Sequence, residues 1–410
     1  MLRPFLRSLV AWLLLAGPAH AASTYTIAGT TYTVDEFPIS ASITDTSPLP
    51  LDLAIDRQTG NTIYMVPEFD RRIYSVARTA TNNTTMTTIT IDGPASPLFR
   101  SAASDTGTTF SPQQERIDTT SDGSVWVSQG GNCFTSSTKN NWSRIMRRRP
   151  DATWEAYTLP VDSACAVGFF VTDTTDVGRQ LWVMSAGTSF LYFSRPRWWH
   201  EGETTATRYP PVDVRWTVAR DFGGVRNFPA QLIRLADGRL AGTLYFGNAF
   251  FLYDPRTLAY TRVTLPTSSF LTPTGAALES SGPWKIRQHV DGNLWIAEDY
   301  AHRVTKVALR GGEAPGTQTT FDLSASLSSD ENPHSLAFDA SGNAWITTYP
   351  LSASGDGRLV RITNAGTVTV GPSFATISLE GGLTGIEIDS AGAIWAACFR
   401  KRRIVRLTPQ

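Results

Sequence analysis

Residues 289–298 (HVDGNLWIAE), 338–348 (FDASGNAWITT) and 388–398 (IDSAGAIWAAC) share one pattern, and that pattern decides the fold. An apolar run meets a turn that contains Gly, and a second apolar run with Trp near its start follows. Short apolar runs on both sides of a Gly turn are typical of β-hairpins. The three stretches therefore predict three copies of the same pair of antiparallel strands.

Looser copies of this hairpin lie upstream and give the chain a regular period. Successive anchor residues are 62, 56, 58, 55, 50 and 50 residues apart, about the length of a four-stranded propeller blade. Thr, Val, Ile and aromatic residues dominate the runs, and no sustained helical spacing follows the amino-terminal segment. We therefore expect an all-β fold, a seven-bladed β-propeller of four-stranded blades. The anchors are Tyr64, Trp126, Trp182, Leu240, Trp295, Trp345 and Trp395.

The last repeat lacks a fourth strand. We expect blades near residues 49–91, 113–160, 164–209, 229–265, 282–323, 332–370 and 382–408. The final one has three strand-like runs, whereas the run Tyr32–Ile39 belongs to no blade. Pairing this run with the last blade would leave no blade edge unpaired. We therefore predict that the N-terminal strand closes the last blade.

The first residues have the parts of a secretory signal peptide. A basic start with Arg3 and Arg7 precedes an apolar stretch from Ser8 to Gly17, and small residues follow up to Ala21. We predict a cleaved signal peptide at 1–21 and a single propeller domain at 22–410. The apolar stretch is too short to span a bilayer. We therefore expect a secreted or periplasmic protein with no membrane span.

Charge argues against a nucleic-acid partner. The chain has 36 basic and 36 acidic residues, and loss of the signal peptide would leave 34 basic residues. Nucleic-acid-binding proteins carry a marked excess of basic residues, often clustered on one face. We expect no nucleic-acid partner, and we expect the protein to be a monomer.

Three Cys residues allow one disulfide in an exported chain. Cys133 and Cys165 lie in loop-like stretches of neighbouring repeats and are the expected pair. Closing that loop would stabilise the fold by roughly 3 kcal/mol on the chain-entropy model. Cys398 would then be a free thiol.

The anchor Trp residues are expected to pack between blades, because each has the same place in its repeat. Other Trp residues fall outside that pattern and are candidates for ligand contact. Trp284 is one of them, and Trp216 is another, in an insertion at Ser194–Phe228 that would suit a loop over the channel mouth.

Candidate site residues follow from propeller geometry. The residue that opens the first strand of a blade, eleven before the anchor, and the residue that closes the second, three after it, become neighbours across one hairpin. We expect them to line the mouth of the central channel. The resulting pairs are Glu115 and Gln129, Trp284 and Glu298, His334 and Thr348, and Thr384 and Cys398.

His334 and Glu298 carry the chemistry in this scheme. They are expected to face each other across a blade boundary, as general base and acid or as ligands of a divalent cation such as Mg²⁺ or Ca²⁺. For Glu298 the structural alternative is an ion pair with Arg303. For His334 it is a loop His that hydrogen bonds to the backbone.

The stretches DGNLWIAEDYAHRVTKV, PHSLAFDASGNAWITT and GRLVRIT resemble the repeats of the virginiamycin B lyase (streptogramin lyase) family of seven-bladed propellers. They resemble SMP-30/gluconolactonase and NHL-repeat propellers more loosely. The resemblance implies a His and a Glu that act with magnesium to abstract a proton and eliminate an ester. His334 matches the His position, but its hairpin ends in Thr348. Glu298 matches the Glu position, but its hairpin opens with Trp284.

Two functions follow. The first is an exported lyase or lactonase-type hydrolase that acts, with a metal ion, on a small ester or lactone, with His334 and Glu298 as catalytic and metal-binding residues. The second is a non-catalytic propeller that binds a small molecule or a peptide. The second would use an aromatic rim of Trp284, Trp216 and Tyr300. The expected substrate contacts are Trp284, Tyr300, Trp216, Glu115, Gln129, Thr348, Thr384 and Cys398.

Overall fold

Antiparallel β-strands make up most of the computed structural model. The described residues are 23–40, 49–68, 72–91, 116–129, 144–158, 163–171, 180–187, 194–200, 229–254, 256–257, 259–266, 270–271, 277–278, 280–309, 314–350, 356–379 and 381–410. No helix among these residues is long and apolar enough to cross a membrane.

Most sheets are formed by strands that follow one another in the chain. In the first half they are β3 (Leu49–Ile55), β4 (Thr62–Glu68), β5 (Arg72–Ala77) and β6 (Thr87–Thr90), then β7 (Ile117–Thr119), β8 (Val125–Gln129), β9 (Arg144–Arg148) and β10 (Trp154–Thr158), then β11 (Ser163–Val171), β12 (Gln180–Gly187) and β13 (Ser194–His200).

The same order continues in the second half. The strands are β14 (Pro229–Arg234), β15 (Leu240–Leu244), β16 (Ala249–Asp254) and β17 (Ala259–Thr264), the short pair β18 (Phe270–Leu271) and β19 (Ala277–Leu278), then β20 (Pro283–Gln288), β21 (Leu294–Glu298), β22 (Arg303–Val307) and β23 (Gln318–Asp322), then β24 (Glu331–Phe338), β25 (Ala344–Pro350), β26 (Leu359–Ile362) and β27 (Val368–Val370).

The last sheet joins the two ends of the described chain. Its order is β1 (Ser23–Ile27), β2 (Thr30–Pro38), β30 (Arg403–Pro409), β29 (Ile394–Cys398) and β28 (Leu383–Ile388). In the described part of the chain, three short 3₁₀ turns lie between strands: η2 (Tyr245–Gly247), η3 (Phe374–Ile377) and η4 (Phe399–Lys401).

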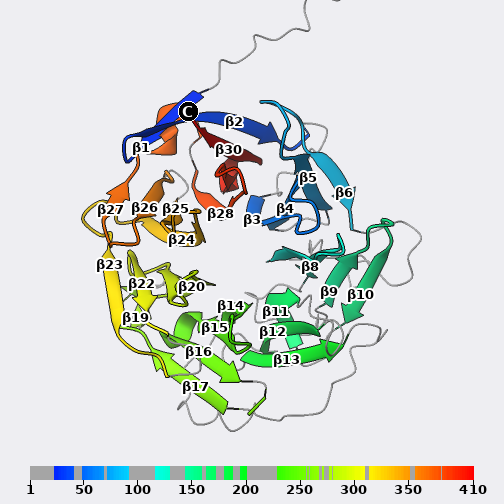
Figure 1. Ribbon diagram of the computed structural model, residues 1–410, viewed down its shortest axis with the longest axis vertical. Helices are drawn as coiled ribbons and strands as arrows, with labels where there is room; N and C mark the ends of the chain where they lie inside the picture. Colours follow the sequence, from blue (N-terminus) through cyan, green and yellow to red (C-terminus); the bar gives the residue numbers. More distant parts are fainter. Residues whose placement is uncertain are drawn as a thin grey trace, which may run out of the picture.

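The sheets stand around a central axis as a β-propeller (Figure 1). Their first strands contact one another in a closed cycle, β3 to β7, β11, β14, β20, β24, β28 and back to β3. The prediction of seven four-stranded blades is wrong, because among the described residues only six of these sheets have four strands or more. The sheet of β11, β12 and β13 has three strands among the described residues. The repeat pattern marks the first two strands of a blade and therefore does not report whether an outer strand is present.

Closure of the ring by the N-terminal strand is found as the sequence predicts. β2 pairs with β30 in antiparallel register from Tyr32 opposite Pro409 to Pro38 opposite Arg403. The pairing is reinforced by an ion pair between Arg406 and Asp35 at 2.5 Å. β1, which the sequence did not predict, pairs with β2 and makes this sheet five-stranded.

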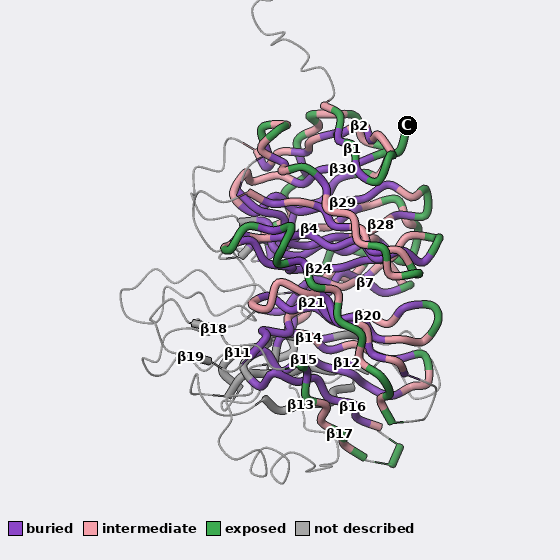
Figure 2. Tube along the Cα trace, turned by 90° about the vertical axis from the view of Figure 1, so that its left-hand side faces the viewer, coloured by how far each residue is buried: buried purple, intermediate pink, exposed green. Residues whose placement is uncertain are grey.

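The core lies between neighbouring blades. Trp295 belongs to a buried apolar cluster with Leu336 and Ile346 of the next sheet, and Trp395 packs with Leu53 and Met65 across the closure of the ring. Figure 2 shows the buried residues running along the inner strands, with exposed residues at the turns. The predicted packing role of the anchor Trp residues is therefore confirmed for these two repeats.

The hairpin turns also orient the Trp side chains. Trp345 Nε1 donates to Asp339 Oδ2 at 2.9 Å, and Trp395 Nε1 donates to Asp389 Oδ2 at 3.0 Å. Each turn closes at a Gly with φ in the left-handed region, for example +81° at Gly392, a conformation that glycine adopts without steric cost. The repeated spacing in the sequence therefore reflects a recurring turn whose Asp side chain orients the buried Trp ring.

One predicted insertion is partly a strand. Ser194–His200, the start of the predicted insertion Ser194–Phe228, is β13, and it pairs with β12. The rest of that insertion lies outside the described residues. This stretch contains Trp198 and Trp199, and aromatic residues are common in strands.

Replacing Trp395 with Ala should destabilise the protein by about 3–5 kcal/mol, because the change leaves a cavity between the first and last blades. Chemical denaturation would measure the free energy of unfolding. Val290→Ala is the matched control, since Val290 is 91 % exposed and its truncation should change stability by less than about 0.5 kcal/mol. Equal effects of the two substitutions would contradict the packing role.

Candidate functional site

The inner strands share an irregularity near their first residues. A β-bulge re-aims the side chains beside it and is common next to functional sites. Here it separates the residues at the start of each inner strand from those that line the middle of the axis. The register shifts fall between Pro50 and Asp52, Pro229 and Leu232, Pro283 and Lys285, Pro333 and Ser335, and Leu383 and Ile386.

His334 lies in an aromatic cluster at the starts of β20 and β24. Its ring centroid is 5.4 Å from that of Trp284 and 5.6 Å from that of Tyr349. Tyr245 contacts both Trp284 and Tyr300, with centroids 5.3 and 5.1 Å away. These five residues, which we call the mouth cluster, place an imidazole inside an aromatic wall.

Asp299 is the acidic neighbour of His334. The distance from His334 Nδ1 to Asp299 Oδ1 is 3.6 Å, and both side chains are only 9 % exposed. Tyr245 donates its hydroxyl hydrogen to Asp299 Oδ2 at 2.9 Å. Burial raises the pKa of Tyr245 well above its ordinary value, and the charge of Asp299 adds to the effect. Tyr245 therefore remains a donor to the carboxylate.

The facing atoms of this pair have no hydrogen bond of their own. His334 Nδ1 and Asp299 Oδ1 are buried and lack a hydrogen-bond partner in the described part of the protein. A buried polar atom without a partner costs about 1–3 kcal/mol. The two atoms are therefore placed either to move closer and form a hydrogen bond with each other, or to bind a polar group of a ligand between them.

Glu298 is held by other residues. Its side chain is fully buried, Arg303 Nη2 lies 2.8 Å from its Oε2 atom, and the Thr305 hydroxyl donates to its Oε1 atom. Both carboxylate oxygens are thus engaged, and the contact with Arg303 is the structural alternative considered from the sequence. The acidic contact of His334 is Asp299, one residue further along the chain.

Three predicted contact residues are buried and make structural contacts. Thr348 donates to Glu331, and Thr384 Oγ1 donates to the carbonyl of Pro50 at 2.8 Å. Cys398 is fully buried in an apolar cluster. Burial raises the pKa of its thiol to about 12, so the thiol is protonated at neutral pH.

The structure describes only some of the other predicted residues. Trp284 and Tyr300 belong to the mouth cluster. Glu115, Trp216 and Cys133 lie outside the described residues, and the side chains of Gln129 and Cys165 do as well. The predicted disulfide and three of the ten predicted site residues therefore stay predictions in full or in part.

Metal ligands do not converge in the described part of the chain, which holds no group of three or more His, Cys, Asp or Glu side chains suited to a metal ion. At the mouth cluster His334 and Asp299 supply two donors, and the oxygens of Glu298 are already engaged. Mg²⁺ and Ca²⁺ prefer six or more oxygen ligands. The described residues therefore do not form a cation cage by themselves.

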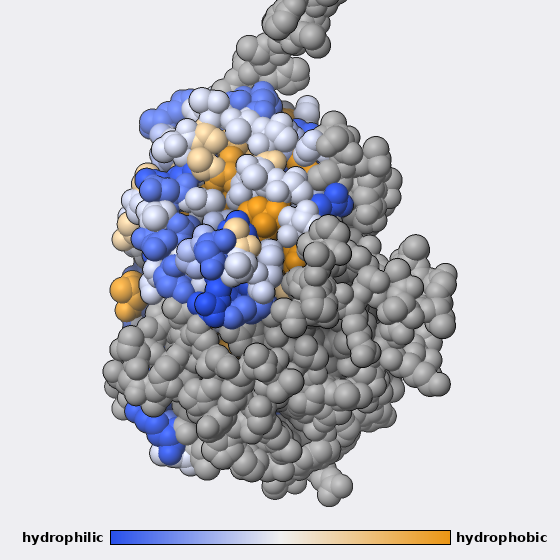
Figure 3. Space-filling model, turned by 90° about the vertical axis from the view of Figure 1, so that its right-hand side faces the viewer, coloured by the Kyte–Doolittle hydropathy of each residue, from blue (hydrophilic) through white to orange (hydrophobic). Residues whose placement is uncertain are grey.

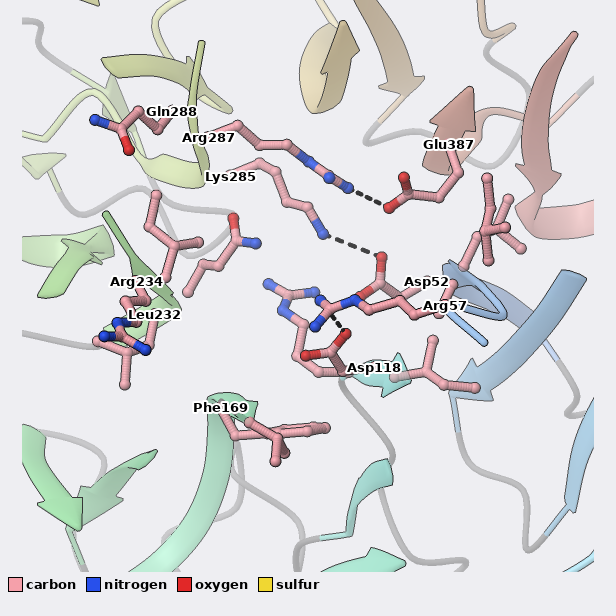
Figure 4. A pocket seen from close by; sticks show the side chains of 18 residues that line it. Asp52, Arg57, Asp118, Phe169, Leu232, Arg234, Lys285, Arg287, Gln288 and Glu387 are labelled. Atoms are coloured by element: carbon pink, nitrogen blue, oxygen red, sulfur yellow. Dashed lines mark hydrogen bonds and ion pairs between the residues drawn. The ribbon is translucent and has the colours of Figure 1, made fainter. Parts of the chain in front are cut away.

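A second set of polar residues lies deeper along the inner strands. It lines a cavity of about 680 Å³ that β3, β7, β11, β14, β20 and β28 surround. Figure 4 shows charged side chains that reach across it from different blades. Lys285 Nζ lies 3.1 Å from Asp52 Oδ1, and Arg57 Nη2 lies 2.7 Å from Asp118 Oδ1. Arg287 forms an ion pair with Glu387.

The pair of Lys285 and Asp52 is buried, with side chains 4 % and 6 % exposed. Burial lowers the pKa of Lys285 from 10.5 to about 8, although the charge of Asp52 opposes this effect. Burial would raise the pKa of Asp52, but the charges of Lys285 and Arg116 outweigh it and the net shift is downward. At neutral pH the pair is therefore ionised.

The sequence contained signals for the mouth cluster and for the charged residues of the cavity. The prediction from the first and last positions of the strands missed them. Tyr245, Asp299 and Tyr349 lie four or five residues after their anchors rather than three. Lys285 and Arg116 lie ten residues before their anchors, and Arg287, Asp118 and Glu387 lie eight before theirs. Charged residues at alternate positions of otherwise apolar inner strands were the available signal.

The closed ring of sheets around an axial cavity defines the protein as a β-propeller. No protein-family model matches the chain, and no curated protein matches its sequence. Solved structures do match. A streptogramin B lyase is 15 % identical with a TM-score of 0.60, over 92 % of this chain and 98 % of the other.

Two further structures are similar at the same level. Catalytically inactive virginiamycin B lyase from Staphylococcus aureus with quinupristin is 18 % identical, with a TM-score of 0.57 over 92 % of this chain and 99 % of the other. YCF48 from Cyanidioschyzon merolae is 12 % identical, with a TM-score of 0.56 over 92 % and 98 %. At these identities the likeness is one of fold.

Lys285 should react with acetic anhydride with a midpoint near pH 8, because only the neutral amine is nucleophilic and burial lowers its pKa. Competitive labelling followed by mass spectrometry would measure this midpoint, with a lysine-containing model peptide as the reference near 10.4. Asp52→Asn should move the Lys285 midpoint below 8, because it removes the negative charge that favours the ammonium form. A Lys285 midpoint equal to that of the model peptide would contradict the assignment.

Proposed function

We propose that the protein is an enzyme that opens a small ester or lactone at the mouth cluster, with His334 as the base. The proposal includes membership of the streptogramin lyase group of propellers, which the sequence resemblance suggests. The likeness in fold to a streptogramin B lyase supports it. The oligomeric state in this proposal is a monomer.

The observation that carries the proposal is the buried pair of His334 and Asp299, 3.6 Å apart inside an aromatic wall. A carboxylate beside one imidazole nitrogen favours the proton on that nitrogen and leaves the other as the base. With Nδ1 turned toward Asp299, Nε2 carries the free electron pair. Asp299 also stabilises the imidazolium that forms, and Tyr245 holds Asp299 in place.

The reaction would be an elimination. His334 Nε2 removes a proton from the carbon next to a carbonyl group, the C–H electrons form a carbon–carbon double bond, and the ester C–O bond breaks to release a carboxylate. In a lactone the ring opens without loss of a fragment. Arg116, whose guanidinium lies 4.9 Å from the Trp284 ring, is a nearby positive charge that favours a developing carboxylate.

Glu298 has a supporting role in this proposal. The ion pair with Arg303 and the hydrogen bond from Thr305 fix the end of β21, and Asp299 follows directly. Glu298 thereby positions Asp299 rather than acting on the substrate. A divalent cation, Mg²⁺ or Ca²⁺, stays part of the expectation from the sequence, and no step of the proposed reaction is derived through it.

The second candidate function is ligand binding without catalysis. Its specific support is the aromatic character of the mouth cluster, since aromatic side chains provide large contact areas for ligands. Among the structural neighbours, YCF48 has been solved bound to a D1 peptide. In this alternative the chain would hold a peptide or a small molecule at the same residues.

His334→Ala should lower turnover of a susceptible ester or lactone at least about 1000-fold, because it removes the base. Asp299→Asn should lower turnover about 100-fold or more with little change in KM, because it disturbs the tautomer and orientation of His334. Quinupristin and a panel of simple lactones would be the substrates, followed by mass spectrometry. An elimination product has the mass of the substrate, whereas hydrolysis adds one water.

His302→Asn is the matched control, because His302 lies in the connection after β21 with φ of +48°, which Asn tolerates. It should leave turnover unchanged. Dialysis against EDTA, with Mg²⁺ or Ca²⁺ returned, tests the expected cation. Binding of the panel without turnover, unchanged by His334→Ala, would favour the non-catalytic alternative and contradict the enzyme.

Export is a further part of the proposal. The signal-like segment 1–21 supports it. Expression of the full chain in a secreting bacterial host, followed by N-terminal sequencing of the mature protein, should find Ala22 as the first residue. Recovery of a chain that retains Arg3 and Arg7 in the cytoplasmic fraction would contradict export.

A further inference from the structure

We propose that the axial cavity binds a small aldehyde with an apolar body, and that Lys285 holds this aldehyde covalently as an imine. The site is separate from the mouth cluster and from the reaction proposed there. Three features support the proposal: the placement of Lys285, the few hydrogen-bond partners of its amine and the form of the cavity.

Lys285 and Asp52 meet in the cavity from two inner strands, β20 and β3. The register shift of β20 lies directly before Lys285, and that of β3 lies directly before Asp52. A bulge re-aims the side chains beside it. Figure 4 shows both side chains pointing into the cavity, where Nζ lies 3.1 Å from Oδ1. The backbone therefore places a primary amine in the cavity.

The Lys285 amine has few partners. In the described part of the chain its one hydrogen-bond acceptor is Asp52, although an ammonium group has three N–H donors. The side chain is only 4 % exposed, and a buried ammonium with donors left over is costly. Burial accordingly lowers the pKa of Lys285 from 10.5 to about 8. The neutral amine, which attacks a carbonyl carbon, is therefore more accessible here than in an exposed lysine.

The cavity gives this amine both space and an entrance. Its volume of about 680 Å³ lies within the range of small-molecule sites. Lys285 and Asp52 are buried, whereas Arg57 and Arg234, which also line the cavity near the hairpin turns, are exposed. A small molecule can therefore enter past the exposed side chains and reach the buried amine.

The remaining walls suit an apolar body. Leu53, Ile117, Phe169 and Leu232, from four inner strands, share the lining with the charged groups. Figure 4 places Phe169 and Leu232 on the far side of the cavity from Glu387. In contrast, the described part of the face in Figure 3 carries apolar residues only in small separate groups among hydrophilic ones. An aldehyde with an apolar body therefore fits the amine and the walls together.

Imine formation needs no reactant besides the aldehyde. The neutral Nζ atom attacks the carbonyl carbon, a C–N bond forms, and the C=O π electrons move to the oxygen, which takes a proton. Asp52 accepts the proton that the nitrogen gives up and returns it to the oxygen. Loss of this oxygen as water leaves a C=N bond, so one amine and one aldehyde give one imine and one water. A proton from solvent then gives the iminium ion, which the Asp52 carboxylate stabilises.

Reductive trapping tests the proposal on the full protein. Hexanal and sodium cyanoborohydride are added at about pH 8, the iminium is reduced to a stable hexyl amine, and peptide mass spectrometry measures the labelling of each Lys. Labelling of Lys285 should saturate with hexanal concentration, because binding precedes reaction. Lys306, whose side chain is 20 % exposed and lies outside the cavity lining, is the internal reference and should label in proportion to concentration.

Chain length separates binding from simple reactivity. The ratio of Lys285 labelling to Lys306 labelling should be at least about tenfold higher with hexanal than with acetaldehyde, because the cavity walls cover the longer chain. The ratio cancels the difference in intrinsic reactivity between the two aldehydes.

Lys285→Arg keeps a cation beside Asp52 but has no primary amine, so it should lose the saturable hexyl adduct. Circular dichroism would verify its fold. The matched control Lys306→Arg should keep that adduct, and so should His334→Ala, which removes only the base of the reaction proposed at the mouth cluster. Absence of Lys285 labelling in the unchanged protein would overturn the proposal. So would Lys285 labelling that rises linearly with hexanal, or a labelling ratio that is equal for the two aldehydes.

Discussion

The pairing of β2 with β30 is the constraint on which the other features depend. It joins residues more than 360 positions apart, as in the ion pair of Arg406 with Asp35, and it brings β28 beside β3. Only a closed ring can hold Asp52 of the first blade opposite Lys285. Closure also buries Trp395 against the first blade. The mouth cluster and the axial cavity are therefore products of ring closure.

Polar groups on the axis are stabilised by partners from other blades. Buried charges are costly unless they are paired, and here Arg287 meets Glu387 and Lys285 meets Asp52 across the cavity. Each pair links blades that share no hydrogen-bonded edge, so the pairs favour one arrangement of the ring. The mouth cluster differs from the axis, because His334 and Asp299 lie close together without a hydrogen bond between them. The axial residues thus form closed ion pairs, whereas the facing atoms of His334 and Asp299 have no hydrogen-bond partner among the described residues.

The repeated sequence pattern correctly predicted several structural features. The hairpins, the buried Trp anchors and the closing strand all follow from alternation, turn glycines and one unassigned apolar run. The outer strand of a blade has no such signature, and the prediction of seven four-stranded blades was wrong for that reason. The acidic neighbour of His334 was also missed. Asp299 is positioned by its backbone hydrogen bond to Gly282, whereas Glu298 finds Arg303 in its own hairpin. The axial ion pairs join residues remote in sequence, which repeat spacing alone does not relate.

Hydrogen exchange followed by mass spectrometry tests the central claim, that pairing of the two chain ends assembles the channel. Buried amides of β2, β30 and the inner strands β20, β24 and β28 should exchange together and only through global unfolding, because opening the closure would open the ring. Fast exchange of β2 and β30, while β20, β24 and β28 stay protected at the level of global unfolding, would contradict the account.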